Sequence, residues 1–406
     1  MMDALDILSN KQDVVPYYQA IFSADEQIIA GYEVLGRIHY QGELRSLGDF
    51  FADESVPDEY KIEIDDYIVE QALEYALAEK LDALIFINRD ANLLMMDQGE
   101  SFLALLLRFQ AKGLNLEQIA IELTEHQFNG DIERLQHLIL YYRTYGIKLA
   151  AANIGRESSN LDRIGKLSPD ILKIDLQPLR MTSASASFND VLYSISLLAR
   201  KIGASILFED IEANFQLQYA WRNGGRYFQG FYLTKPEAQF LQKNLLKEKL
   251  SSEFHHFIIH EKKKLETFYE LSEQFYQRIH HLAGISEKLC SSQDQLITML
   301  SKELSDCSFR IYVCDSDGFQ TTGNIFKAGD GWVFQEQYKH KNWSWRPYFL
   351  ENLMKMRIGR KGFFSDLYSD IETGETIRTY SYPLDDGHYL FIDLPYQYLY
   401  DQNGML

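Results

Sequence analysis

Short apolar runs alternate with longer amphipathic stretches between residues 14 and 234 of this 406-residue chain. The apolar runs predict strands at 14–23, 31–38, 84–91, 119–126, 148–155, 171–177, 205–211 and 227–234. Helical patterns such as 60–80, 131–146 and 189–203 separate most of them. Continuous apolar runs between amphipathic helices are typical of a parallel sheet that is covered on both faces. Eight such strands in about 220 residues predict an α/β fold, a closed (β/α)8 TIM-type barrel. The link 24–30 is too short for a crossover helix, so we expect one antiparallel strand.

Changes in the pattern divide the chain into three predicted parts: a barrel domain at 1–249, a connector helix at 250–285 and a small α+β domain at 286–406. Neither glycine nor proline occurs between Pro236 and Gly284, and Phe254, Ile258 and Leu265 begin an imperfect apolar repeat. A helix that lies on one neighbour explains this repeat at least as well as a coiled coil does. After residue 285, alternating strand-like segments appear with Asp-Gly turns.

The net charge of the chain limits the classes of partner that it is expected to bind. Lysine and arginine number 40, and aspartate and glutamate number 59, which gives a net charge of −19. Binding to a DNA or RNA duplex needs a basic surface, so this charge argues against such a partner. No uncharged apolar run approaches the ~20 residues of a membrane span, so we expect no membrane insertion. The first residues lack a basic segment followed by an apolar one, and the three cysteines are few and odd in number. These features favour a cytoplasmic location.

Polar residues stand in the predicted barrel strands, most of them late in the strand, where a buried strand should be apolar. They are Glu33, Asn88, Glu122, Lys173, Asp175 and Glu209. One such residue alone is commonly a salt-bridged strand end. Six of them at successive strand ends indicate a shared site, because barrel enzymes keep their active sites at the carboxyl ends of the strands. Carboxylate and amide oxygens suit Mg2+ or Mn2+.

The motifs around these residues resemble the EAL-domain family of cyclic di-GMP phosphodiesterases, over roughly residues 14–240. The E-A-L signature of the family reads Glu33-Val34-Leu35 and is followed by Gly36-Arg37. The strand asparagine matches Asn88, the E-x-T-E motif reads 122–125, the L-K-I-D motif reads 172–175, and the A-E-G-V-E motif appears as 208–212. The terminal Q-G-…-P motif runs from Gln229 to Pro236. Together, in this order and spacing, the motifs make the resemblance specific.

The resemblance implies hydrolysis of one phosphodiester bond of cyclic di-GMP, assisted by divalent ions. Metal ligands by resemblance would be Glu33, Asn88 and Glu122, and the cation would be Mg2+ or Mn2+, with Ca2+ as an alternative. Lys173 and Glu209 would be catalytic, because they would orient or deprotonate the attacking water. The ligand-binding residues would be Gln19, Leu35, Arg37, Asp175, Gln229 and Pro236.

The loop that the family writes D-D-F-G-T-G departs from this pattern. Its first aspartate, normally a metal ligand, is Ala152 here, and its second is the neutral Asn153. The second glycine of the loop is replaced by Glu157. The site therefore loses two negative charges where two divalent cations would need them. We expect a weakly bound cation and an enzyme that is weak or inactive.

Segments 343–349, 362–375 and 381–395 are similar to Cache/PAS-like sensor domains. Arg346, Tyr348 and Asp393 are candidates for a small-molecule pocket in the concavity of the predicted sheet. An aromatic core with surface charges explains the same segments equally well, because aromatic residues at such spacing mostly pack.

The sequence favours a catalytically impaired, cyclic di-GMP-binding signalling protein. A genuine phosphodiesterase, in which the strand-end glutamates compensate for the lost aspartate, is an alternative of another class. A nucleotide-independent scaffold that acts through the connector and the C-terminal domain is a third. Intact Arg37, Lys173 and Gln229 favour retained ligand binding, whereas Ala152 disfavours the enzyme. The apolar stripe of the connector and the pairing habit of the family favour a homodimer.

Overall fold

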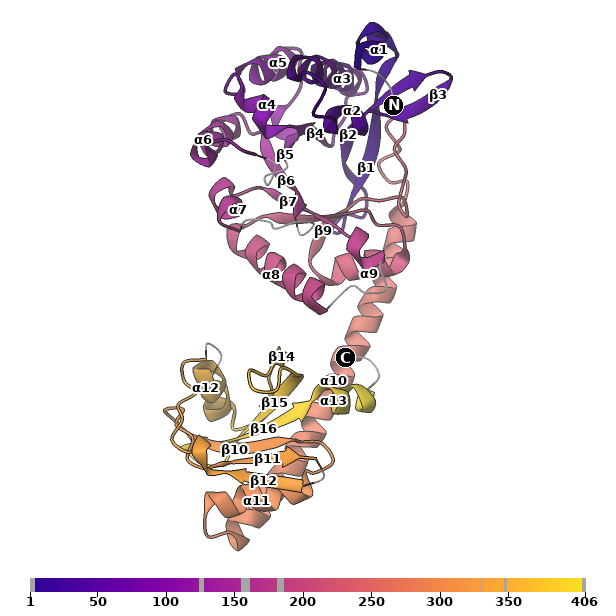
Figure 1. Ribbon diagram of the computed structural model, residues 1–406. Helices are drawn as coiled ribbons and strands as arrows, with labels where there is room; N and C mark the ends of the chain where they lie inside the picture. Colours follow the sequence, from indigo (N-terminus) through magenta and orange to yellow (C-terminus); the bar gives the residue numbers. More distant parts are fainter. Residues whose placement is uncertain are drawn as a thin grey trace. The chain divides into compact units, whose positions relative to one another are not determined.

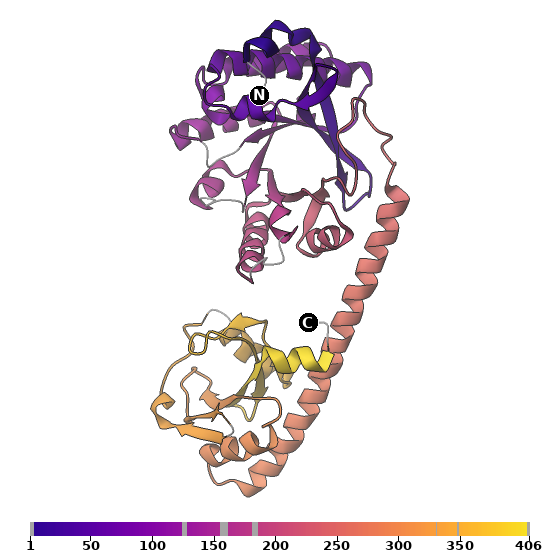
Figure 2. The ribbon, with the colours of Figure 1, turned by 45° about the vertical axis from the view of Figure 1, so that its right-hand side comes forward.

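The computed structural model describes residues 4–123, 128–154, 161–180, 186–329, 331–346 and 349–403 (Figure 1). The chain forms two compact units, Met1–His255 and His256–Leu406. One continuous helix, α10 (Lys247–Leu289), begins in the first unit and ends in the second (Figure 2). The predicted connector 250–285 lies within this helix.

The first unit contains the predicted barrel. Its strands are β1 (Val14–Ser23), β2 (Ile29–Tyr40), β4 (Leu84–Arg89), β5 (Ile119–Leu123), β6 (Lys148–Ile154), β7 (Ile171–Asp175), β8 (Ser205–Glu209) and β9 (Gly225–Phe228). They follow the order β1-β9-β8-β7-β6-β5-β4-β2, and pairing of β1 with β2 closes the ring. Strand β1 is antiparallel to both of its neighbours, whereas the other barrel pairs are parallel. The predicted barrel and its one antiparallel strand are confirmed. The short β3 (Glu43–Ser46) extends the sheet beyond β2.

Helices between the strands cover the outside of the barrel (Figure 1). The longer ones are α3 (Asp58–Ala78), α5 (Glu100–Ala111), α6 (Ile132–Arg143), α7 (Leu161–Leu167), α8 (Ala186–Ile202) and α9 (Asn214–Arg222). Shorter helices are α1 (Ala4–Ser9), α2 (Gly48–Ala52) and α4 (Ala91–Met95), with 3-10 turns at Lys11–Asp13, Leu116–Gln118 and Gln177–Arg180. Helix α6 begins at the N-cap Asp131, whose side chain accepts from the amide of Glu133. A carboxylate at this position satisfies an amide that the helix itself leaves unpaired.

An apolar layer fills the middle of the barrel and places the polar layer above it. The layer consists of the buried residues Ile21, Phe86, Ala120, Ala150, Ile171 and Leu207. Side chains two residues apart on a strand point to the same face. The next inward positions on β4, β5, β6, β7 and β8 are therefore Asn88, Glu122, Ala152, Lys173 and Glu209. The strand alternation alone thus brings the predicted site residues into one layer.

The last predicted strand, 227–234, is a strand only as far as Phe228. Gly230 follows with a φ of 152°, a conformation that favours glycine. A Cβ atom on Gly230 would lie 2.1 Å from the carbonyl oxygen of Ile211. The chain turns here and packs its backbone against the end of β8, which the apolar run 227–234 does not reveal.

The second unit is a helix-and-sheet domain. Its antiparallel sheet has the order β12-β11-β10-β16-β15-β13, and β14 also pairs with β15. The strands are β10 (Arg310–Asp315), β11 (Asn324–Ala328), β12 (Gly331–Gln335), β13 (Phe363–Phe364), β14 (Tyr368–Ser369), β15 (Thr376–Pro383) and β16 (His388–Pro395). Helices α11 (Gln293–Glu303), α12 (Phe349–Gly359) and α13 (Tyr396–Asn403) and a 3-10 turn at Glu336–Tyr338 complete it. The α+β architecture is confirmed, and the Cache/PAS type stays a prediction.

Alternation along β10 gives this sheet two apolar faces. Ile311 and Val313 belong to a core cluster with Phe275 and Ile279 of α10, together with residues of α11. Tyr312 and its neighbours on that face pack instead with the apolar side of α12. The sheet is therefore covered on both faces within its own unit. Across the described residues, no helix combines the length and the apolar content that crossing a bilayer requires.

Replacing Gly230 with alanine tests the close approach at the end of β8. Gly113 is the matched control, because its φ is 108° but a Cβ there would meet nothing within 4 Å. We expect Gly113→Ala to lower the free energy of unfolding by about 1 kcal/mol through backbone strain alone. Gly230→Ala should lower it by about 3 kcal/mol or more, because backbone must also move. Urea unfolding followed by circular dichroism measures both, and equal losses would contradict the packing described here.

Candidate functional site

The ammonium group of Lys173 lies at the centre of the polar layer. The side chain is fully buried, and its Nζ lies 3.0 Å from Glu33 Oε2, 2.6 Å from Glu122 Oε2 and 3.1 Å from Glu209 Oε2. These four residues come from strands β7, β2, β5 and β8. The sequence prediction that they converge at one end of the barrel agrees with these contacts.

Two amide side chains hold Glu33 from either side. Asn88 Nδ2 donates to Glu33 Oε1 at 2.9 Å, and Gln229 Nε2 donates to Glu33 Oε2 at 2.7 Å. The carbonyl oxygen of the Gln229 side chain is buried and has no hydrogen-bond partner among the residues that the structure describes. A buried acceptor without a donor is unfavourable, which points to a cation or donor group at this position.

The pKa values of the three glutamates shift in different directions, although the three side chains share one ammonium group. Burial raises the pKa of Glu122 to about 8, and the neighbouring charge of Glu33 adds to this rise. Burial also raises the pKa of Glu209, in spite of Lys173. Burial disfavours the charge of Glu33 as well, but Lys173 and the two amide donors outweigh it and hold its pKa below the ordinary value. Burial opposes the charge of Lys173, and the three carboxylates nevertheless raise its pKa well above the ordinary value.

Carboxylate oxygens of Glu33, Glu122 and Glu209 lie within 4.8 Å of one another, a spacing that a single cation can bridge. Carboxylate and amide oxygens are ligands that divalent cations prefer. The donor set therefore fits one divalent cation. Ala152 on β6 is buried and offers no ligand atom, and the pairing of β6 with β7 is irregular between Ala151 and Ile154. The side chain of Asn153 lies outside what the structure describes.

A cavity of about 790 Å³ opens beside this layer. Asn88 and Glu122 line it together with the predicted ligand-binding residues Leu35 and Arg37. Arg37 donates to the carbonyl of Gly36 at 2.9 Å, and burial lowers the pKa of its guanidinium, which stays cationic. Two of the three metal-binding candidates, Asn88 and Glu122, therefore share one cavity with the candidate phosphate-binding arginine.

A second group of charges, which the sequence pattern does not reveal, lies on the wall of this cavity. Arg89 follows Asn88 on β4, and its Nη1 and Nη2 lie 2.6 Å from Asp65 and 2.8 Å from Asp66 of α3. Its guanidinium also lies 4.0 Å from the ring centroid of Phe102. The only sequence signal was a charged residue directly after a strand-end asparagine, which is common on surfaces.

The remaining predicted residues of the barrel take different places. Asp175 is buried on β7, two residues beyond Lys173, and accepts from the amide of Gln177 at 2.6 Å. Gln19 is half-buried on β1 and is the direct strand partner of Glu33. Pro236 is half-buried in the segment after β9, beside Glu237, which bridges to β1. A ligand-binding role for these three stays a prediction.

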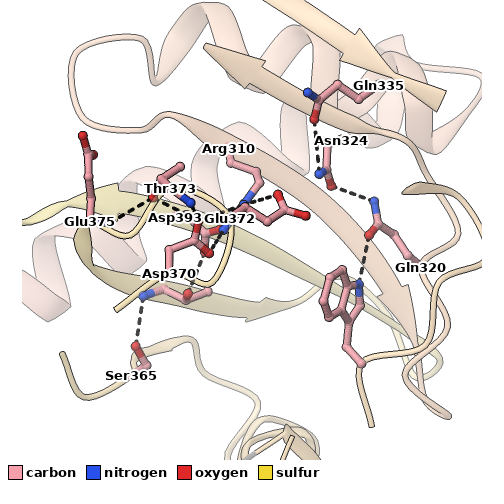
Figure 3. A network of polar contacts seen from close by, with 12 residues as sticks. Arg310, Gln320, Asn324, Gln335, Ser365, Asp370, Glu372, Thr373, Glu375 and Asp393 are labelled. Atoms are coloured by element: carbon pink, nitrogen blue, oxygen red, sulfur yellow. Dashed lines mark hydrogen bonds and ion pairs between the residues drawn. The ribbon is translucent and has the colours of Figure 1, made fainter. Parts of the chain in front are cut away.

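In the second unit, Asp393 belongs to an ion cluster around the buried Arg310 (Figure 3). Arg310 lies 2.6 Å from Asp393, 2.6 Å from Asp370 and 3.0 Å from Glu372. Arg346 lies over the ring of Trp343, and both line a cavity of about 10 Å³, which holds about one water molecule. The predicted small-molecule pocket of Arg346, Tyr348 and Asp393 stays a prediction, and Tyr348 lies outside the described residues.

Comparison with known proteins identifies both units. The family model of the EAL domain matches residues 2–236. The family model of an EAL-domain associated signalling protein domain matches residues 240–406. The uncharacterized EAL-domain containing protein YkuI of Bacillus subtilis (strain 168) is 63% identical over 407 residues, which cover 100% of both chains. The crystal structure of that protein, in complex with c-di-GMP and calcium, has a TM-score of 0.96 to this chain and covers 100% of each.

More distant relatives match the barrel unit. The probable cyclic di-GMP phosphodiesterase PdeG of Escherichia coli (strain K12) is 28% identical over 247 residues, which cover 56% of this chain and 45% of that protein. The chain thus matches less than half the length of PdeG. An EAL domain protein from Listeria monocytogenes EGD-e has a TM-score of 0.51 at 21% identity, over 58% of this chain and 94% of its own. This last likeness is one of fold.

Replacing Lys173 with methionine tests the charge balance of the site. The buried Glu33 and Glu122 and the half-buried Glu209 would lose their ammonium partner, so the free energy of unfolding at pH 7 should fall by about 3–5 kcal/mol. Carboxyl groups whose pKa is higher in the folded than in the unfolded state favour folding when protonated, so the loss should shrink as the pH falls towards 5. Mn2+ should recover part of the stability, because it can replace the lost positive charge.

The matched control is Lys166→Met, which removes an exposed ion pair with Asp162 on α7. It should change stability by at most about 0.5 kcal/mol, and Mn2+ should not alter that change. Denaturant unfolding with and without millimolar Mn2+ measures both variants. If Mn2+ stabilises Lys173→Met no more than the control, the three glutamates do not form a cation site.

Proposed function

The chain belongs to the EAL-domain family, and from this membership we propose that it binds cyclic di-GMP at the carboxyl end of the barrel. The observation that carries the proposal is the Lys173-centred cluster of glutamates, which borders the cavity that Arg37 lines. The B. subtilis relative has been crystallised with c-di-GMP and calcium, and its barrel is matched over its full length. This likeness supports the same class of ligand here.

The proposed site divides its work between a cation and the side chains around it. Glu33, Glu122 and Asn88 would hold one divalent cation, Mg2+ or Mn2+, with Ca2+ as an alternative. When bound, the cation neutralises phosphate charge and polarises the phosphodiester bond. Arg37 would bind a phosphate with two hydrogen bonds from its guanidinium. Gln229 holds Glu33 in place through the 2.7 Å hydrogen bond between them.

We propose that hydrolysis is impaired. A buried methyl group at position 152 supplies neither a ligand nor a negative charge from β6. The remaining donor set fits one cation rather than two, so an attacking water would be weakly activated. The proposed function is therefore that of a receptor, which binds cyclic di-GMP without efficient hydrolysis.

An active phosphodiesterase is the second candidate. Glu209 lies 3.1 Å from Lys173, and burial raises its pKa, which makes its carboxylate a stronger base. In that case Lys173 and Glu209 would orient and deprotonate the attacking water. A scaffold that binds no nucleotide is the third candidate. The homodimer and the C-terminal small-molecule ligand also stay predictions.

Titration of the full chain with cyclic di-GMP in a calorimeter tests the proposed function. We expect binding that strengthens with Mg2+ or Mn2+, because the cation neutralises phosphate charge beside the glutamates. Arg37→Met should weaken binding about tenfold or more, since a charge-assisted contact is lost. Exposed Arg134 on α6 is the matched control, and Arg134→Met should leave affinity unchanged. If high micromolar cyclic di-GMP gives no heat of binding and no change in thermal stability, only the scaffold that binds no nucleotide remains.

Restoring the missing carboxylate tests the impairment. Ala152→Asp should raise Mn2+ affinity and produce measurable hydrolysis of cyclic di-GMP to the linear dinucleotide, and adding Asn153→Asp should raise both further. Ala152→Asn is the matched control, because it has nearly the same shape without the charge. Chromatography of the products under saturating Mn2+ measures the reaction. Rapid turnover by the unmodified chain would instead establish the active phosphodiesterase.

A further inference from the structure

The segment after β9 carries Gln229 into the site and is fixed to the end of β8. The amide of Gln229 donates to the carbonyl of Phe208 at 2.9 Å, one residue before Glu209. The amide of Ile211 donates to the carbonyl of Gln229 at 3.1 Å, and the amide of Tyr232 donates to the carbonyl of Ile211 at 2.9 Å. The positions of Gln229 and Glu209 therefore depend on how this segment is held.

The side chain of Tyr232 joins the segment to the first two turns of α10. Its hydroxyl donates to Glu253 Oε1 at 2.6 Å, and Asn214 at the start of α9 donates to the same hydroxyl at 3.3 Å. Lys249 lies over the ring, 3.8 Å from its centroid, and donates from Nζ to the Tyr232 carbonyl at 3.1 Å. One aromatic residue thus connects the start of α10 to the backbone at the end of β8.

A glutamate is an unusual residue for a contact whose only role is to pack α10 against the barrel unit. Its second carboxylate oxygen, Oε2, is buried and lacks a hydrogen-bond partner in the described part of the chain. Burying an acceptor without a donor is unfavourable, so an apolar side chain of similar size would hold the helix at least as well. What the carboxylate adds is direction, because a charge-assisted hydrogen bond is short and fixes the position of the tyrosine hydroxyl.

We propose that Tyr232 and Glu253 are positioning residues for the barrel-end site. Through their hydrogen bond, the first turns of α10 hold Gln229 and the end of β8 in the geometry that binds the ligand. The inference rests on the proposed function, because the ligand it refers to is cyclic di-GMP. Since α10 continues to Leu289 in the second unit, the helix shared by the two units also supports the site.

The test uses the full chain, four single variants, and the double variant that combines Tyr232→Phe with Glu253→Leu. Tyr232→Phe removes the hydroxyl, Glu253→Leu removes the acceptor, and Glu253→Gln keeps an acceptor oxygen. Tyr193→Phe on α8 is the matched control, because that tyrosine is 61% exposed. Tyr232→Phe and Glu253→Leu should each raise the dissociation constant of cyclic di-GMP about fivefold, and the double variant should bind no more weakly than either. Glu253→Gln and the control should stay within about twofold of the unmodified chain.

Hydrogen exchange without nucleotide separates this inference from the proposed function. The amides of Gln229 and Tyr232 should exchange at least about threefold faster in Tyr232→Phe and Glu253→Leu, and at the unmodified rate in Tyr193→Phe. If the two amides exchange faster in these variants but the unmodified chain binds no cyclic di-GMP, the proposed function is wrong. The coupling of the segment to α10 is then still supported. Lower thermal stability with unchanged exchange and unchanged affinity would overturn the inference, because the contact would then be an anchor only.

Discussion

The barrel end depends on one buried ammonium group. Lys173 touches three carboxylates that arrive from three other strands, so a single positive charge holds together the polar layer above the apolar centre of the barrel. One ammonium group cannot neutralise three carboxylates, and burial together with the neighbouring carboxylates raises the pKa of Glu122 and of Glu209. The excess of carboxylates makes this layer suitable for a cation and an anionic phosphodiester together. Binding chemistry and fold stability are therefore two results of one electrostatic arrangement.

Much of this arrangement could be predicted from the sequence, because it follows from strand alternation. The apolar runs located all eight barrel strands, and the short link 24–30 correctly indicated that β1 runs against its neighbours. Glu33, Glu122, Lys173 and Glu209 stand out because a charged residue in a buried strand needs a partner. Their convergence was predictable since barrel strands present their carboxyl ends at one face.

Other parts of the site depend on contacts between residues that are distant in sequence and carry no periodic signal. Arg89 and its two aspartates read as ordinary surface charges until α3 is packed beside β4. Arg310 reads as a polar start of a strand, although three carboxylates surround it. Tyr232 sits in a run that looks like strand, and only the turn at Gly230 directs it towards α10. Such pairs need the tertiary fold before their chemistry can be read.

The continuity of α10 has a consequence for how the two units melt. A helix is nucleated once and then extended residue by residue, so its nine residues in the first unit and its longer part in the second share one nucleation event. When the second unit unfolds, the helix frays back to its last anchored turn, and the buried Leu250 and Phe254 mark where the barrel unit resists. Each unit has its own core, so the second unit can melt in a transition of its own while the first two turns of α10 stay folded with the barrel unit. The anchored turns of α10 therefore set how far the unfolding of the second unit can spread into the first.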